Sequence, residues 1–264
     1  MNERLKFLPA AALAVLVSTP APSRSATAVP APGQTIRLGG DTEVVSRRIG
    51  DDWVSGSAAI TTPLPVGYPA PTPPGAIELK TYPSLRRAEV TSKVGNAGLA
   101  MNMAFFPLFN HIQRREIAMT SPVEMDYQGL SVGGEPLPVA AEPAPLKAMT
   151  MSFLYRSPEL GPVGADAEDA KVVVVDTEQA TYLSLGMQGG YSLERVREGM
   201  AQLHEWLAAN PGWESVGDIR ALHYNGPERR DRDKWLEVQV QVQVQVQAAP
   251  RAAEQADQAS VPRG

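Results

Sequence analysis

The chain repeats one order of secondary-structure patterns, with the second copy about 95 residues after the first. The first copy has an extended run at 77–91, a helical pattern at 98–113, and strand patterns at 116–127 and 147–155. The second has an extended run at 171–187, a helical pattern at 192–209, and strand patterns at 213–224 and 235–246. A β-α-β-β unit cannot cover the apolar face of its own small sheet. We therefore predict one α+β domain over 77–247, built from duplicated β-α-β-β repeats at about 77–155 and 171–247.

The segments outside these repeats have a different composition. Arg4 and Lys6 precede an apolar run at 7–17 that is too short to span a bilayer, and small residues follow it. This pattern predicts a signal peptide at 1–26 and a periplasmic or secreted protein; the alternative is a disordered or interfacial N-terminus. Residues 27–76 are rich in proline and glycine, which predicts a linker or an arm laid over the domain, and 248–264 are predicted to be a disordered tail.

Composition excludes several classes of function. The chain has no cysteine, so disulfides and thiolate metal sites are ruled out. Its formal charge is −5, and loss of residues 1–26 would remove a net +2 and leave −7. Such an acidic protein is poorly suited to bind a phosphate backbone, so we expect no nucleic-acid partner. No segment has the length and hydropathy of a stable membrane span.

The first predicted helix is apolar on all sides. Its large apolar residues point in every direction around the axis, so one sheet cannot cover them all: Leu99, Met101, Met103, Phe105, Phe106, Leu108, Phe109 and Ile112. Pro107 removes one amide donor inside the helix. The second helix has an ordinary apolar stripe and a polar face, with Ser192 as its cap. The first helix therefore predicts apolar surface that is free for a ligand or a partner.

Methionines concentrate in the same half of the chain. Six of the nine fall between Met101 and Met151. Flexible thioether side chains could line a site for a flat apolar guest. They could equally fill the core of the first repeat or contact a second subunit.

Residues that could carry catalysis or bind a metal are few. The sequence lacks the nucleophile elbow, the phosphate loop, the zinc-protease helix motif and a dinucleotide glycine turn, so we predict no enzyme activity. Of the three histidines, His204 and His223 have surface or packed contexts. His111 lies in the last turn of the apolar helix, which makes it the candidate metal ligand.

The segments IELKTYPSLRRAEV, FFPLFNHIQ and IAMTSPVEM resemble the SOUL heme-binding protein family. The C-terminal WLAANPGWESVGDIRALHYNGP is also similar to that family, and the resemblance covers 77–240. It implies a twisted antiparallel sheet or distorted barrel with two flanking helices outside. It also implies that heme or another tetrapyrrole binds in a hydrophobic groove along the first helix.

Carried onto this chain, the resemblance places Met103, Phe106, Pro107 and His111 at the tetrapyrrole, and Met101 and Phe105 extend the same apolar surface. Arginines beside the helix are candidates to meet the propionates: Arg114 and Arg115, with Arg86 and Arg87. In histidine-ligated relatives the histidine stands just before the strand tyrosine, a position that Thr81 occupies here.

We therefore predict an exported, noncatalytic heme- or tetrapyrrole-binding protein. The main alternative is a protein–protein interaction module of the cell envelope that uses the same apolar surface. A less favoured alternative is a small-molecule hydrolase that uses a pocket carboxylate such as Glu124, which lies on the strand face opposite the apolar one.

Overall fold

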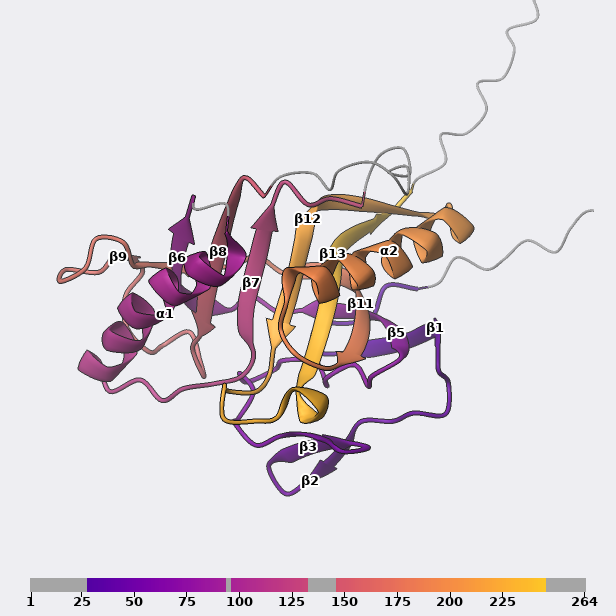
Figure 1. Ribbon diagram of the computed structural model, residues 1–264, viewed down its shortest axis with the longest axis horizontal. Helices are drawn as coiled ribbons and strands as arrows, with labels where there is room; N and C mark the ends of the chain where they lie inside the picture. Colours follow the sequence, from indigo (N-terminus) through magenta and orange to yellow (C-terminus); the bar gives the residue numbers. More distant parts are fainter. Residues whose placement is uncertain (1–27, 94–95, 133–145, 246–264) are drawn as a thin grey trace, which may run out of the picture.

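The computed structural model describes residues 28–93, 96–132 and 146–245; the predicted signal peptide and C-terminal tail lie outside these ranges. The described residues form a ten-stranded antiparallel sheet, a three-stranded sheet and two α-helices (Figure 1). The elements are β1 (Thr35–Gly40), β2 (Arg47–Ile49), β3 (Asp52–Ser55), β4 (Ala58–Ile60), β5 (Ala76–Tyr82), β6 (Arg86–Ser92), α1 (Ala97–Arg114), β7 (Val123–Gln128), β8 (Ala148–Leu154), β9 (Gly164–Ala165), β10 (Val173–Asp176), β11 (Ala180–Gln188), α2 (Leu193–Ala209), β12 (Trp213–His223), the 3-10 turn η1 (Asp231–Asp233) and β13 (Trp235–Val244). The predicted α+β class is confirmed.

The large sheet is open, because β1 and β9 end it on either side in the order β1-β5-β11-β13-β12-β7-β8-β6-β10-β9. Of the two expected forms, the antiparallel sheet is therefore found, and a closed barrel is wrong. Read outward from its middle, the order gives β12, β13, β11 and β5 on one side and β7, β8, β6 and β10 on the other. On each side of the middle, the first two strands are therefore consecutive in the chain.

Both helices start at side-chain caps. Asn96 accepts a hydrogen bond from the amide of Leu99, and Ser192 accepts one from the amide of Arg195. The predicted strand at 116–127 is shorter than expected and begins only at Val123. Pro122 has no amide hydrogen to give to a neighbouring strand, which favours a start after it.

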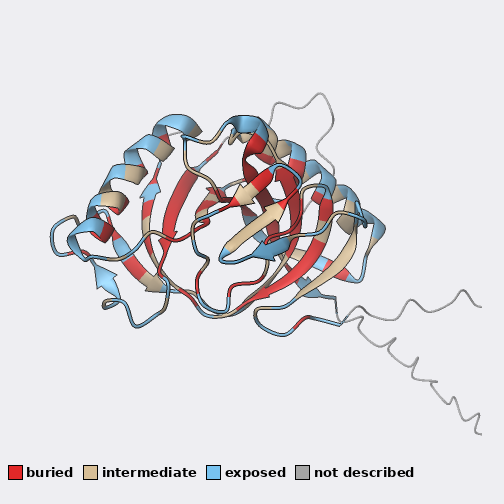
Figure 2. Ribbon diagram, turned by 90° about the horizontal axis from the view of Figure 1, so that it is seen from below, coloured by how far each residue is buried: buried red, intermediate tan, exposed pale blue. Residues whose placement is uncertain are grey.

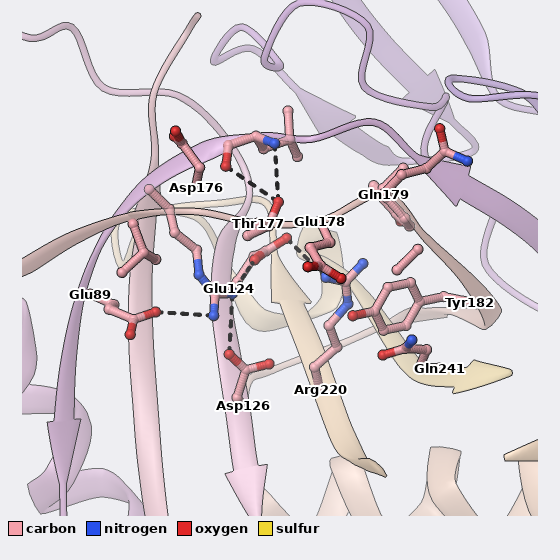
Figure 3. Close-up of a pocket in the computed structure, with 15 residues that line it drawn as sticks. Glu89, Glu124, Asp126, Asp176, Thr177, Glu178, Gln179, Tyr182, Arg220 and Gln241 are labelled. Carbon is pink, nitrogen blue, oxygen red and sulfur yellow. Dashed lines mark hydrogen bonds and ion pairs between the residues drawn. The ribbon is translucent and has the colours of Figure 1, made fainter. Parts of the chain in front are cut away.

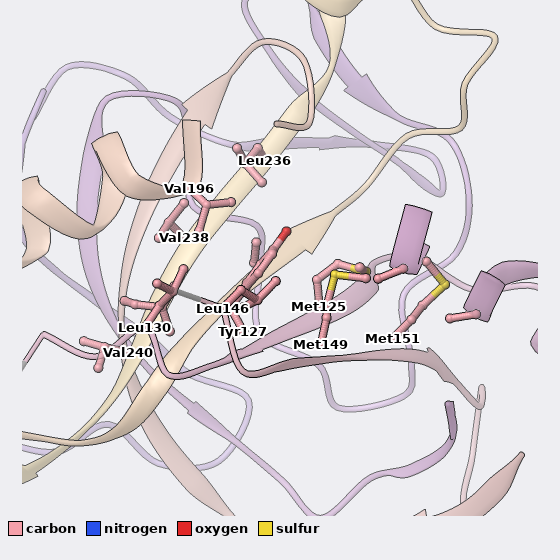
Figure 4. Close-up of a cluster of buried hydrophobic side chains, with 14 of the residues drawn as sticks. Met125, Tyr127, Leu130, Leu146, Met149, Met151, Val196, Leu236, Val238 and Val240 are labelled. Atoms are coloured by element: carbon pink, nitrogen blue, oxygen red, sulfur yellow. The ribbon is translucent and has the colours of Figure 1, made fainter. Parts of the chain in front are cut away.

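The two helices lie outside the curve of the large sheet (Figure 2). Helix α1 packs on β6 and β8, and α2 packs on β11, β12 and β13. Met125, Met149 and Met151 are buried in this layer, and Figure 4 shows them beside Tyr127 in the hydrophobic core. The strand methionines therefore fill the core, which was one of the two alternatives.

The N-terminal segment 28–75 packs against the opposite face of the sheet. Strand β1 pairs with β5 at the sheet edge, and β2, β3 and β4 form the small sheet. Thr72 is fully buried, and its carbonyl accepts a hydrogen bond of 2.7 Å from the indole of Trp235. The segment thus covers part of this face as a packed arm.

Candidate functional site

Helix α1 exposes an apolar stripe. Leu99, Met103 and Phe106 are 51%, 53% and 64% exposed. Their spacing of four and three residues puts them on one side of the helix. The opposite side, with Ala100, Ala104, Leu108, His111 and Ile112, is buried. The stripe therefore lies on the surface as a row of large apolar side chains that the described residues leave open.

Other predicted ligand contacts flank this stripe. Met101, Phe105 and Pro107 are half-buried. The ring of Phe105 lies edge-on to Phe153 of β8, with centroids 5.6 Å apart. Phe105 therefore anchors α1 to the sheet and borders the stripe, while Met103 and Phe106 are the predicted residues that are open to a ligand.

His111 does not face the stripe. Its side chain is fully buried, with Nδ1 2.6 Å from an Asp166 oxygen and Nε2 2.6 Å from the Tyr155 hydroxyl. Both ring nitrogens are therefore engaged, and neither is available to iron in this conformation. In this conformation His111 ties the end of α1 to the loop before β10, so its predicted roles as metal ligand and cofactor contact would require it to leave Asp166 and Tyr155.

Asp166 is the centre of this cluster. It also accepts hydrogen bonds from Arg114 and Arg115 and from the amides of Glu168 and Asp169. Burial alone would raise the pKa of Asp166, but these donors outweigh it and hold that pKa well below its usual range. Burial lowers the pKa of His111, although Asp166 opposes the shift.

The four arginines proposed for the propionates are already paired. Arg114 and Arg115 contact Asp166, and Arg86 binds Asp176 through two bonds of 2.7 Å. Arg87 points to the other face of the sheet, toward Glu124. The structure therefore does not bring these side chains together beside the stripe; a ligand could recruit Arg114 or Arg115 only by competing with Asp166.

Thr81 is also remote from α1. It lies on β5, bonded to the hydroxyl of Thr181, and four strands separate β5 from β8 in the sheet order. A histidine at this position would not reach the stripe. In the described structure, the position of Thr81 is therefore not part of the surface beside α1.

A second feature, which joins residues that no single sequence motif contains, lies on the face opposite the helices. A cavity of about 430 Å³ opens beside β7, β11 and β12 (Figure 3). At its floor Glu124 accepts hydrogen bonds from Arg87 at 3.0 Å, from Arg220 at 3.3 Å and from the hydroxyl of Tyr68 at 3.2 Å. Burial alone would raise the pKa of Glu124, but the two arginines keep it below its usual range.

The polar cluster continues from this cavity into the core. Arg220 donates a hydrogen bond to Gln239, and Gln239 donates one to Glu237. The carboxylate of Glu237 also accepts a hydrogen bond of 2.8 Å from Nζ of Lys80. The alternation of valine and glutamine in β13 was the sequence signal for it. That pattern separates Val238 and Val240, which pack under α2, from Glu237 and Gln239 on the polar face.

Two further features bear on function. In the ranges that the structure describes, no three histidine, cysteine or carboxylate side chains are grouped to hold a metal ion. Over the same ranges neither helix combines the length and hydropathy needed to cross a membrane.

Comparison with known proteins identifies a family. A model of the family described as SOUL heme-binding protein matches residues 69–240. The match begins within the N-terminal arm and includes α1, most of β13 and all the cavity residues except Gln241. None of the curated proteins compared with the chain matches it.

Solved structures show general likeness at low identity. The chain is similar to the C-terminal domain of EcmrR, with a TM-score of 0.49 and 12% identity over 64% of this chain and 97% of that one. Two structures from Listeria innocua, an uncharacterized conserved protein and a hydrolase, each have a TM-score of 0.45. Their identities are 14% and 13%, and each covers 66% of this chain and 94% of its own.

Proposed function

Because the chain belongs to the SOUL heme-binding protein family, we propose that it is a noncatalytic protein that binds heme or a related tetrapyrrole on the exposed stripe of α1. The observation that carries this proposal is the row of Leu99, Met103 and Phe106, three large apolar side chains more than half exposed on one helix face. A flat macrocycle laid on this row removes apolar surface from water on both partners.

The two halves of the domain differ in this respect. We infer from the matching strand order that α1 and α2 are equivalent helices of a duplicated unit. The outward residues of α2 are polar: Glu194, Glu198, Gln202 and Glu205. Of the two described helices, only α1 therefore exposes large apolar side chains, and we propose one tetrapyrrole per chain.

A hemin titration of Phe106→Asp tests this site. Burying a phenylalanine contributes about 1.5–3 kcal/mol, so its loss should weaken hemin binding by about ten- to hundredfold. The readout is the shift of the Soret band as hemin is added. Ile49→Asp is the matched control, because Ile49 on β2 is 63% exposed against 64% for Phe106 and lies away from α1. Equal affinity of the two variants, or no Soret shift with the unchanged protein, would refute the site.

His111 supplies a second arm of the same titration. We expect hemin bound to His111→Gln to keep the spectrum of the unchanged complex, because both nitrogens of His111 are held by Asp166 and Tyr155. Loss of a histidine-ligated spectrum in this variant would show that the histidine leaves these partners to bind iron.

The proposal that the protein is noncatalytic is supported by the state of Glu124. Its carboxylate is buried and held by two arginines and a tyrosine hydroxyl, with a pKa below its usual range. A general acid or base works best with a pKa near the working pH. Glu124 is therefore poorly placed for the hydrolase alternative.

The same stripe also supports the alternative of a protein–protein interaction module. Light scattering of the ligand-free protein separates the two functions. A monomer that binds hemin supports the tetrapyrrole proposal, whereas a dimer broken by Phe106→Asp supports the interaction module.

We further propose that the protein is exported, on the pattern of Arg4, Lys6 and the apolar run at 7–17. Mass spectrometry of the protein recovered from its own cells should show a mature N-terminus near residue 27. An intact residue 1 on all molecules would contradict export by this route.

A further inference from the structure

The cavity on the polar face contains a buried donor that has no partner. Arg220 is 6% exposed, and its Nε and Nη1 donate to Gln239 and Glu124. Its Nη2 is buried and has no hydrogen-bond partner among the described residues. Buried guanidinium hydrogens are almost always bonded. An acceptor atom from outside the chain would complete the set.

The guanidinium of Arg220 is held in a fixed place. It lies 3.5 Å from the ring centroid of Tyr182 and 4.6 Å from that of Tyr82. Figure 3 shows it beside Tyr182, with Glu124 and Asp126 on the neighbouring strand. Arg220 thus lies against both tyrosine rings, and it lines the cavity together with them.

Charge in the cavity is unbalanced in the negative direction. Its lining includes five carboxylates, Glu89, Glu124, Asp126, Asp176 and Glu178, and two guanidinium groups, Arg87 and Arg220. Arg86, outside the lining, neutralises Asp176. Arg87 contacts Glu89, Glu124 and Asp126, so three carboxylates share it, and Arg220 also contacts Glu124. Burial and then the neighbouring carboxylates raise the pKa of Asp126, even though Arg87 lowers it.

These features exclude simpler ligands. An anion alone would meet a surplus of carboxylates, and a cation alone would leave Nη2 of Arg220 without an acceptor. A metal ion is disfavoured because no three metal-binding side chains are grouped in the described ranges and the carboxylates are bonded to arginines. The lining is largely polar, with Leu85, Val175 and Ala180 as its aliphatic members, which disfavours an apolar ligand.

We propose that this cavity is a second binding site, separate from α1, for a small hydrophilic molecule that carries both an ammonium group and an oxygen acceptor. The acceptor binds Nη2 of Arg220, and the ammonium group lies against Asp126 with Glu178 at the rim. The cavity of about 430 Å³ is within the range of about 300–1,000 Å³ seen for small-molecule sites.

A ladder of ω-amino acids from glycine to 6-aminohexanoate tests this site, because it varies the distance between ammonium and carboxylate. Binding is measured on the full chain by calorimetry, and by the NMR shift of the side-chain Nε–H of Arg220. We expect one length to bind at least about tenfold tighter than the alkylamine and the alkanoate of the same length. The NMR signal of the Arg220 Nε–H should shift when this amino acid is added.

Two variants locate the ammonium group. Asp126→Asn and Glu178→Gln should each weaken the binding of the ω-amino acid that binds most tightly. Glu194→Gln on α2 makes the same change of charge and should leave that binding unchanged. All three should bind hemin as the unchanged protein does, so this test is independent of the tetrapyrrole site.

Three results would overturn the proposal. The first is that no member of the ladder binds at 10 mM, a concentration at which a site of about millimolar affinity would be mostly filled. The second is that the amine or the alkanoate alone binds as well as the amino acid. The third is that calcium or magnesium ions displace the best ladder member.

Discussion

Replacing Lys80 with methionine should lower the free energy of unfolding by about 3–5 kcal/mol, the usual cost of breaking a buried ion pair. The side chains of Lys80 and Glu237 are both 0% exposed, and Nζ lies 2.8 Å and 3.0 Å from the two carboxylate oxygens. Methionine fills a similar volume but leaves Glu237 as a buried charge without a counterion. Urea unfolding followed by circular dichroism measures the difference.

The remaining partners of Glu237 reduce this cost without removing it. Ser184, Tyr224, Thr72 and Gln239 donate to the carboxylate, and all four are neutral. The double variant Lys80→Met, Glu237→Gln removes both charges, and we expect it to recover a large part of the loss. A single variant within about 1 kcal/mol of the unchanged protein, or a double variant no more stable than the single, would contradict this account.

Acid should partly rescue the single variant. In the unchanged protein burial would raise the pKa of Glu237, but Lys80, and after it Ser184 and Tyr224, more than offset burial and hold the pKa below its usual value. Without Lys80 the pKa of the folded state should exceed that of the unfolded state. Stability would then be greatest at low pH and would fall as pH rises through the new pKa. The deficit relative to the unchanged protein should therefore shrink toward acid pH.

Periodicity identified most of the elements. The apolar spacing at 192–209 and the capping serine predicted α2 almost to its observed ends at Leu193 and Ala209. The alternation at 235–246 predicted β13, which pairs with β11 on one side and β12 on the other. These features depend on neighbours a few residues apart, so local pattern is sufficient to show them.

The candidate sites were harder to predict because they depend on pairings between distant segments. The apolar character of α1 was evident, but Met103 and Phe106 are open while Leu108 is buried, and this division depends on which side meets β6 and β8. His111 was predicted to bind iron because it lies in the last turn of this apolar helix, whereas its partner Asp166 lies 55 residues away in an irregular loop. No periodic pattern connects those two residues.

The polar face shows the same limit. Glu124, Arg220 and Glu237 come from three different strands, and only the sheet order brings them into one cluster. Alternation indicated that Glu124 and Gln239 avoid the apolar face, but it could not indicate what they contact there. The buried pair of Lys80 and Glu237 spans 157 residues and depends on β11 lying between β5 and β13.

His223 should make the protein sensitive to mild acid. It is 6% exposed, its ring stacks on Tyr191 with centroids 4.0 Å apart, and its Nε2 has no hydrogen-bond partner among the described residues. Burial, and then the charge of Lys234, lower the pKa of His223 from the usual 6.5 to about 3. The folded state therefore resists protonation of this ring.

The sign of the effect follows from proton binding. Below pH 6.5 the unfolded chain takes up a proton at His223, whereas the folded chain does so only near pH 3. Stability from this residue is thus fully present above pH 6.5 and is lost as pH falls. The expected loss between pH 7 and pH 5 is about 2 kcal/mol. Urea unfolding at a series of pH values measures it.

His223→Phe isolates this contribution, because phenylalanine can keep the stack on Tyr191 and does not titrate. The difference in unfolding free energy between the unchanged protein and this variant should change by about 2 kcal/mol between pH 7 and pH 5. His111, whose pKa burial also lowers, acts in the same direction and stays in both proteins, so it cancels in the comparison. Parallel pH profiles for the two proteins would show that the ring of His223 reaches water and protonates in the folded state.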